Sequence, residues 1–235
     1  TMNLQHLAPL RQQLADTTFR NRQVLDRVRH GETGLLACVS KAGEAQGKPT
    51  EWFAHGGQYL ASTAYYTARL FAEMVRLREA FPFLRLQHRD KDAELTALVL
   101  RIHLAFAGQY GVYYAVQETI GQDMLLPDGK VAGFLGFSQA VRDPERGIWY
   151  AQLLQFYLLA ASGRNLNRLE HAVAAMEALS RFLDEAVGAS ASVSDRLRLE
   201  SEAQEWRDPE QNTPATGDTN SAAHPQLRRT PPPER

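Results

Sequence analysis

The stretch GQYLASTAYYTARLFAEMVRLREA, residues 57–80, gives the clearest fold signal in this 235-residue chain. Its bulky side chains recur every three or four residues, which places them on one face of an α-helix. A proline at position 82 cannot continue that helix. The members of the face are Tyr59, Thr63, Tyr66, Leu70, Met74 and Leu77. We therefore expect a long amphipathic helix over 57–80.

Three further stretches carry the same spacing, at 92–116, 145–161 and 166–187. The first is apolar on nearly every side, which is typical of a helix at the centre of a bundle. Before the second stand Asp143 and Pro144, a capping acid followed by proline at the first helical position. Because 44% of the residues are hydrophobic, the chain can bury a core. The sequence thus predicts an all-α multi-helix bundle.

Two segments depart from this pattern. Within 4–30 the apolar spacing is interrupted at 16–18, so we expect two short helices there. The Pro-Asp-Gly sequence at 127–129 separates two apolar runs. Proline and glycine at such spacing favour a tight turn. We expect a turn or one short β-hairpin near 123–134, and this is the one place where we expect strand.

Composition divides the chain into three parts. We expect residues 1–190 to form a single helical-bundle domain and residues 191–207 to form a charged helix. Residues 208–235 are rich in Pro, Thr, Asn and Ser. Such a segment cannot bury enough apolar surface to offset its ordering entropy, so we expect a disordered C-terminal tail.

Charge and cysteine content restrict the environment. The net charge is −1, so no global positive field attracts nucleic acid or an anionic membrane. Cys38 is the only cysteine, which excludes an internal disulfide and indicates a cytoplasmic protein. We expect no secretion signal and no membrane span, because no basic start and no long apolar run occur. Arginine far outnumbers lysine, as in chains from GC-rich bacterial genomes.

One short motif carries candidate chemistry. Arg164 and Asn165 stand at the start of the last long helix, with His171 seven residues after the arginine. On a helix this spacing is nearly two turns, so a base and a phosphate-holding guanidinium would share a face. The motif resembles the Arg-Asn…His signature of HEPN ribonucleases. The resemblance implies a dimeric, metal-independent RNA-cleaving site with these three residues. The alternative is that Asn165 caps the helix and the other two are surface residues.

Two further histidines are candidate ligand-binding or interface residues. His55 precedes a glycine pair, where backbone amides of a tight turn could face a ligand. His103 lies beside the apolar stripe of the 92–116 helix. We expect it to be buried and satisfied by one backbone or side-chain partner.

Aromatic residues are dense on the expected helices. A tyrosine is difficult to bury without a partner for its hydroxyl, so some of them should line a pocket or an interface. We favour an interface. The candidates are Tyr59, Tyr66, Tyr110, Tyr113 and Trp149.

No motif fixes a reaction. The chain lacks a His-Glu-x-x-His pair and a glycine-rich phosphate loop, so we expect no metal and no cofactor. The sequence favours a protein-interaction and oligomerisation module, a homo-oligomer such as a dimer, with a protein partner at 193–206 and the tail. Two alternatives stay open: a HEPN-like ribonuclease, for which RNA would be the partner, and a binder of a small apolar ligand.

Overall fold

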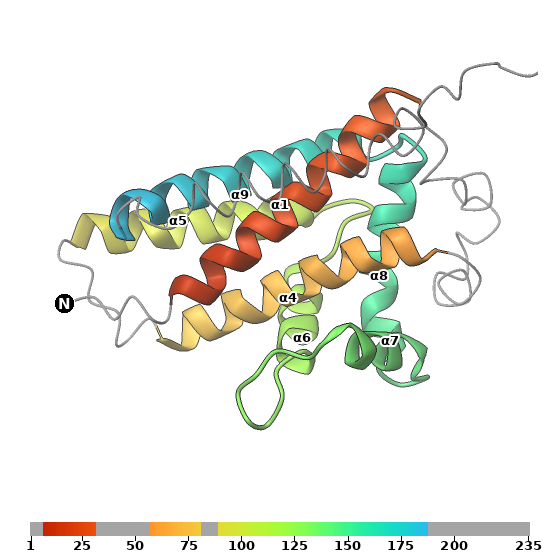
Figure 1. Ribbon diagram of the computed structural model, residues 1–235, viewed down its shortest axis with the longest axis horizontal. Coiled ribbons are helices and arrows are strands. Elements are labelled where there is room, and N and C mark those ends of the chain that lie inside the picture. Colours follow the sequence, from red (N-terminus) through yellow and green to blue (C-terminus); the bar gives the residue numbers. More distant parts are fainter. Residues whose placement is uncertain (1–6, 32–56, 81–88, 188–235) are drawn as a thin grey trace, which may run out of the picture. The chain divides into compact units, whose positions relative to one another are not determined.

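The computed structural model describes residues 7–31, 57–80 and 89–187 of the chain, and these belong to one compact unit. Every regular element of these residues is a helix (Figure 1). Their bounds are α1 Leu7–Arg29, α4 Gln58–Ala80, α5 Arg89–Phe106, α6 Tyr114–Asp123, α7 Phe134–Arg142, α8 Gly147–Ala161 and α9 Leu166–Val187. The expected all-α fold is therefore confirmed for the described residues, whereas the expected tail and charged helix lie outside them.

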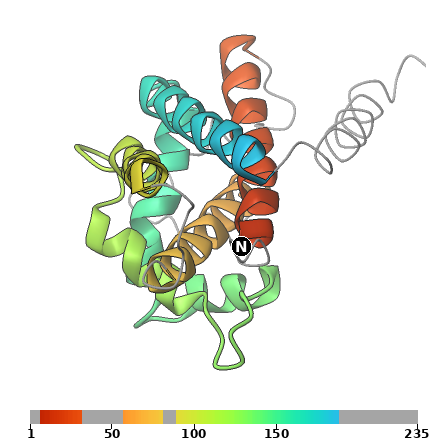
Figure 2. The same cartoon turned by 90° about the vertical axis from the view of Figure 1, so that its left-hand side faces the viewer.

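Helix α4 lies at the centre of the packing, in contact with α1, α6, α7 and α8. Within the predicted apolar face Thr63, Leu70, Met74 and Leu77 are buried, whereas Tyr59 and Tyr66 are half-buried. The alanines beside this face are buried too, because small side chains let neighbouring helices approach closely. Helix α1 contacts α4 and also contacts α9, and α9 lies between α1 and α5 (Figure 2).

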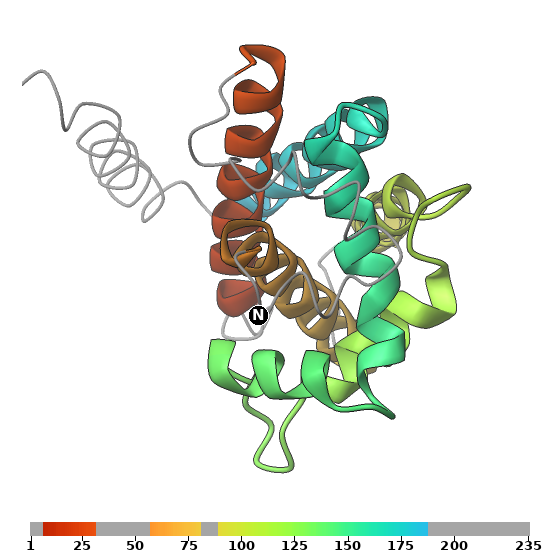
Figure 3. The same cartoon turned by 90° about the vertical axis from the view of Figure 1, so that its right-hand side faces the viewer.

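Helix α8 is the most apolar helix of the described residues, and α7 lies at its lower end in Figure 3. It is buried on almost every side from Leu153 to Ala161. The prediction that the 92–116 helix occupies the centre is wrong. Leu100 and Leu104 on α5 are 48% and 60% exposed, so the apolar outer side of α5 is not covered within the described residues.

The predicted helix over 92–116 is in fact two helices. Helix α5 ends at Phe106 and α6 begins at Tyr114. Between them Gly108 and Tyr110 have positive φ angles of 109° and 61°. Such a backbone cannot continue a right-handed helix, so the chain turns here and α6 packs on α4 instead.

The N-terminal segment forms one helix, α1, rather than the two that were expected. Of the polar residues that looked like an interruption, Thr17 is a buried hydrogen-bonding group at the contact with α4. Thr17 donates its hydroxyl hydrogen to the Gln13 carbonyl, at 2.7 Å, and lies 3.1 Å from the Tyr66 carbonyl. Because the Thr17 hydroxyl has one partner within α1 and another on α4, this polar residue does not interrupt α1.

A buried hydrogen-bond network joins α1, α4 and α8. The fully buried hydroxyl of Tyr157 lies 2.7 Å from the Asn21 side-chain oxygen and 2.6 Å from the Thr67 hydroxyl. The Asn21 amide nitrogen donates to the Thr17 carbonyl, so its oxygen is left to accept from Tyr157. The network satisfies polar groups that would otherwise be costly to bury.

Three ion pairs connect α1 to α9. Their N–O distances are 2.5 to 2.7 Å, and their acidic members stand seven residues apart on α9. The pairs are Arg11–Asp184, Arg22–Glu177 and Arg29–Glu170.

The segment 123–134 contains a turn and no strand. An isolated antiparallel bridge joins Leu125 and Val131, and the Asp128 carboxylate accepts the amide hydrogen of Lys130 at 3.0 Å. Gly129 has the positive φ of 78° that such a turn requires. The expected turn is present, but the β-hairpin is not shown. Helix α7, which follows, was not predicted.

Candidate functional site

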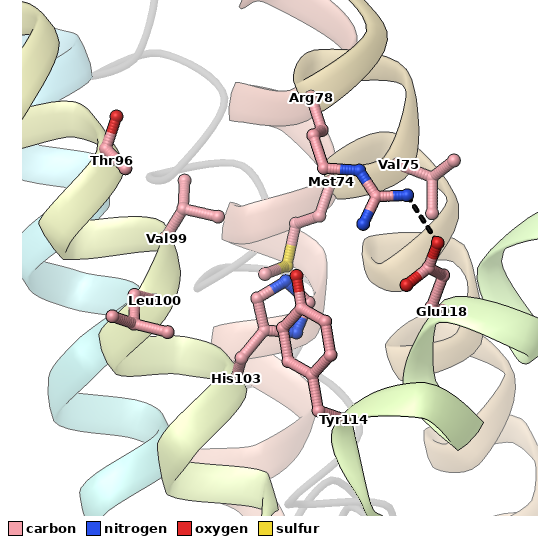
Figure 4. Close-up of a pocket in the computed structure, with 9 residues that line it drawn as sticks. All are labelled: Met74, Val75, Arg78, Thr96, Val99, Leu100, His103, Tyr114 and Glu118. Carbon is pink, nitrogen blue, oxygen red and sulfur yellow. Dashed lines mark hydrogen bonds and ion pairs between the residues drawn. The ribbon is translucent and has the colours of Figure 1, made fainter.

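A pocket of about 260 Å³ lies between α4, α5 and α6 (Figure 4). Most of its lining is hydrocarbon, with a small number of polar groups among the apolar side chains, as in many ligand sites. The lining residues are Met74, Val75, Arg78, Thr96, Val99, Leu100, His103, Tyr114 and Glu118.

The imidazole of His103 is held in this pocket by Gln117 of α6. The Gln117 amide nitrogen donates to the carbonyl of Val112 at 2.7 Å and to that of His103 at 3.0 Å. Both amide hydrogens are then used, and the side-chain oxygen of Gln117 accepts a hydrogen bond from Nδ1 of His103 at 2.7 Å. The fully buried Gln117 therefore sets both the position and the orientation of the ring.

The loop between α5 and α6 brings these two side chains together. The amide hydrogen of Val112 is donated to the Phe106 carbonyl at 2.8 Å, which closes the loop. A Cβ at Gly111 would collide with that same carbonyl, so only glycine fits there. The guanidinium of Arg168 on α9 donates a hydrogen bond to the Ala107 carbonyl, which ties the loop to α9.

Aromatic rings enclose His103 on two sides. The ring of Tyr114 lies 4.6 Å from the imidazole centroid, and the ring of Phe71 is stacked behind it at 6.5 Å. Figure 4 shows one ring nitrogen of His103 pointing toward Met74 and Arg78, among the residues that line the pocket. This burial, more than any charge nearby, lowers the pKa of His103 below its ordinary value. The imidazole is therefore neutral near pH 7.

An ion pair lies at the edge of the pocket. The Arg78 guanidinium is 2.5 Å from the Glu118 carboxylate. The hydrogen bond from Arg78 lowers the pKa of Glu118, so the carboxylate is ionised and balances the guanidinium charge. Together with the neutral His103, this leaves the pocket without a net charge of its own.

The structure places the predicted aromatic candidates in different regions. Tyr59 lies at the α1–α4 contact with its ring 4.6 Å from the guanidinium carbon of Arg20, and the Tyr66 carbonyl accepts hydrogen bonds from α1. Tyr110 and Tyr113 on the α5–α6 loop are 69% and 61% exposed, and Trp149 on α8 is 44% exposed. Of these candidates only His103 lines the pocket, and His55 lies outside the described residues.

The Arg164, Asn165 and His171 motif lies at the start of α9. The Asn165 carbonyl accepts the amide hydrogens of Arg168 and Leu169, so Asn165 occupies the N-cap position. Arg164 precedes the helix, directly after Gly163 with its φ of 79°. The argument that Arg164 and His171 share a helix face therefore does not hold, although both side chains are exposed.

His171 lines an open groove of about 520 Å³ between α5 and α9. Alanines form much of the groove, with the exposed Leu104 beside them. Arg101 and Arg181 also line it, and neither they nor His171 has an ion-pair partner among the described residues. The acidic residues of α9 at the opposite face are bound to α1, so within the described chain the groove retains its positive charge.

Sequence reasoning identified His103 but missed Gln117, Arg78 and Glu118 as its neighbours. Gln117 is the first polar residue after the apolar run from Val112 to Val116, which was a usable signal. The expectation of one continuous helix over 92–116 obscured it, because such a helix does not fold α6 back toward α5.

No protein-family model, curated protein or solved structure matches the chain. Among the residues described here, no helix is both long and apolar enough to cross a membrane. Nor do those same residues contain a group of three or more His, Cys, Asp or Glu side chains placed to hold a metal ion.

Proposed function

We propose that this domain binds a small, mostly apolar molecule in the pocket between α4, α5 and α6. The observation that carries the proposal is the His103 ring, fixed by Gln117 and facing a space lined by Met74, Val75 and Val99. An apolar pocket with a few fixed polar groups is the usual form of a small-molecule site. A histidine whose role is only to pack in the core would have close-packed neighbours on all sides, without a cavity beside it.

The volume is suitable for such a ligand. An apolar cavity of roughly 150 Å³ is enough to hold benzene. The pocket of about 260 Å³ therefore accommodates a single ring with a small substituent. Tyr114 and Leu100 line it and are partly exposed, so they leave a route of entry.

Binding of fluorinated one-ring aromatic fragments, observed by ¹⁹F NMR, tests this function. Thr96 lines the pocket and is exposed, so Thr96→Trp should fill the space without disturbing the core. The matched control is Ala97→Trp, next to it on α5 and exposed, but outside the pocket lining. We expect binding to wild type and Ala97→Trp, and none to Thr96→Trp. Equal behaviour of the two variants, with both folded by circular dichroism, would contradict the proposal.

A second function, protein interaction, is favoured by the α5–α9 groove. Arg101 and Arg181, which have no ion-pair partner in the part of the chain that the structure describes, line it together with alanines and the exposed Leu104. The partner that fits is an amphipathic helix with an apolar stripe and acidic flanks. Exposed Tyr110 and Tyr113 on the neighbouring loop would extend the contact, since tyrosines are enriched at interfaces. In this proposal the domain acts in the cytoplasm of a bacterium, as a homo-oligomer or with a protein partner.

A labelled synthetic helix with leucine on one face and glutamate on the others tests the groove. We expect Arg181→Glu to weaken its binding about tenfold, whereas Lys130→Glu on the distant 123–134 turn should leave it unchanged. The same peptide with lysine in place of glutamate should not bind. Equal binding of the two peptides would exclude this surface, and sedimentation velocity tests the oligomeric state.

The ribonuclease alternative has one observation in its favour, the exposure of Arg164 and His171. If the protein is a ribonuclease, the purified chain should cleave RNA. His171→Ala should then abolish cleavage with almost no change in melting temperature, because an exposed side chain contributes little to stability. Absence of cleavage by wild type would exclude it.

A further inference from the structure

We propose that the ligand of the pocket is a neutral molecule with an apolar body and one hydroxyl or N–H group that donates a hydrogen bond to Nε2 of His103. A phenol is the simplest example. This inference rests on the proposed small-ligand function and specifies its ligand class.

The first step follows from the amide of Gln117. Its NH₂ group is committed to the carbonyls of His103 and Val112, so the atom that faces Nδ1 of His103 is the amide oxygen, which can only accept. Nδ1 must therefore carry the hydrogen of this 2.7 Å bond. A neutral imidazole has only one N–H group, so Nε2 carries a lone pair and acts as an acceptor.

The second step is that Nε2 lacks a donor. Within the described residues, the only hydrogen bond of the His103 ring is the one from Nδ1 to Gln117. Tyr114 contacts the imidazole through its ring, with a tilt of 56° between the two planes. A ligand that donates to Nε2 would make a hydrogen bond that the protein itself does not provide.

The third step excludes an anionic ligand. Arg78 is neutralised by Glu118 at 2.5 Å, so it offers no free charge. A carboxylate in the pocket would face the lone pair of Nε2 and lose its hydration without compensation. The apolar walls formed by Met74, Val75 and Val99 favour a ring or a short hydrocarbon chain.

Three fragments of nearly equal size test the ligand class: 4-fluorophenol donates a hydrogen bond, 4-fluoroanisole does not, and 4-fluorobenzoate is an anion. We expect the phenol to bind about five- to tenfold more tightly than the anisole, the ratio of one added hydrogen bond, and the benzoate to bind most weakly. Preference for the benzoate, or equal binding of the phenol and the anisole, would overturn the inference while leaving the pocket function in place. Binding of none of the three would overturn both.

His103→Leu removes the acceptor and puts an apolar side chain of similar size in its place. The phenol should then lose its preference over the anisole. His171→Leu makes the same substitution on the exposed side of α9 and should retain the preference. Because His103→Leu also removes the hydrogen bond to Gln117, the tautomer of wild-type His103 gives an independent readout by long-range ¹H–¹⁵N NMR. We expect hydrogen on Nδ1; hydrogen on Nε2 would overturn the inference.

Discussion

Gln117 and His103 are joined twice, by a hydrogen bond to the imidazole at 2.7 Å and by one to the His103 carbonyl at 3.0 Å. The second bond reaches from α6 to the last turn of α5, where the His103 carbonyl also accepts the amide hydrogen of Ala107 at 3.0 Å. A single amide therefore links the start of α6 to the end of α5 and fixes the tautomer of His103.

Replacement of Gln117 should destabilise the domain. Gln117→Leu leaves the Val112 carbonyl and the imidazole N–H without their partner, whereas the His103 carbonyl keeps the amide hydrogen of Ala107. At roughly 1–3 kcal/mol for each buried group, with partial relief from solvent, we expect a loss of about 3 kcal/mol in urea denaturation. Gln122→Leu, on the exposed side of α6, should change the free energy of unfolding by less than about 0.5 kcal/mol. Similar losses for the two variants would contradict this account.

A pair of glycine substitutions tests the loop. Gly111→Ala places a Cβ against the Phe106 carbonyl, so we expect a loss of more than about 2 kcal/mol together with weaker fragment binding in the pocket. At Gly133 an added Cβ meets no atom within 4 Å, and φ is −75°. Gly133→Ala should change stability by less than about 0.5 kcal/mol. Thermal unfolding of both variants provides the measurement.

The buried hydroxyl of Tyr157 contributes to stability through two side-chain partners. Tyr157→Phe leaves the Asn21 oxygen without its donor, since the Asn21 amide is committed to Thr17. We expect a loss of about 1–3 kcal/mol in chemical denaturation. The same substitution at the exposed Tyr110 should have almost no effect. If Tyr157→Phe were neutral, the network would not be formed as described.

His103 should make stability depend on pH. Burial lowers its pKa in the folded protein below the ordinary value of about 6.5. Between the two values the unfolded chain binds a proton and the folded chain does not, so the free energy of unfolding rises with pH and the full contribution is present above about 6.5. Urea denaturation at about pH 5.5 and about pH 7.5 should show a smaller difference for His103→Phe than for wild type. An equal difference would exclude this assignment.

The helices that apolar spacing predicts most directly, 57–80 and 166–187, agree closely with α4 and α9. The spacing succeeds there because one face of each helix is buried along its whole length. It fails at 92–116, where apolar residues continue through Gly108 and Gly111 although the backbone turns. Helical periodicity is read from side chains alone. It does not detect this turn, which depends on the positive φ angles of Gly108 and Tyr110.

The candidate site was only partly accessible from sequence for the same reason. His103 could be identified as a histidine beside an apolar stripe. Its pairing with Gln117 depends on the turn at 107–113, which brings the start of α6 against the end of α5. Arg78 on α4 and Glu118 on α6 form their ion pair although they are 40 residues apart in the sequence. Such a contact has no local pattern in the chain.

The seven-residue spacing of Glu170, Glu177 and Asp184 has a consequence for how α1 and α9 align. Each of the three meets an arginine of α1, so sliding one helix along the other by a single turn would separate every pair at once. Exposed ion pairs add little to stability individually, about 1 kcal/mol or less. Their combined effect is on register: they select one alignment of two antiparallel helices over its neighbours.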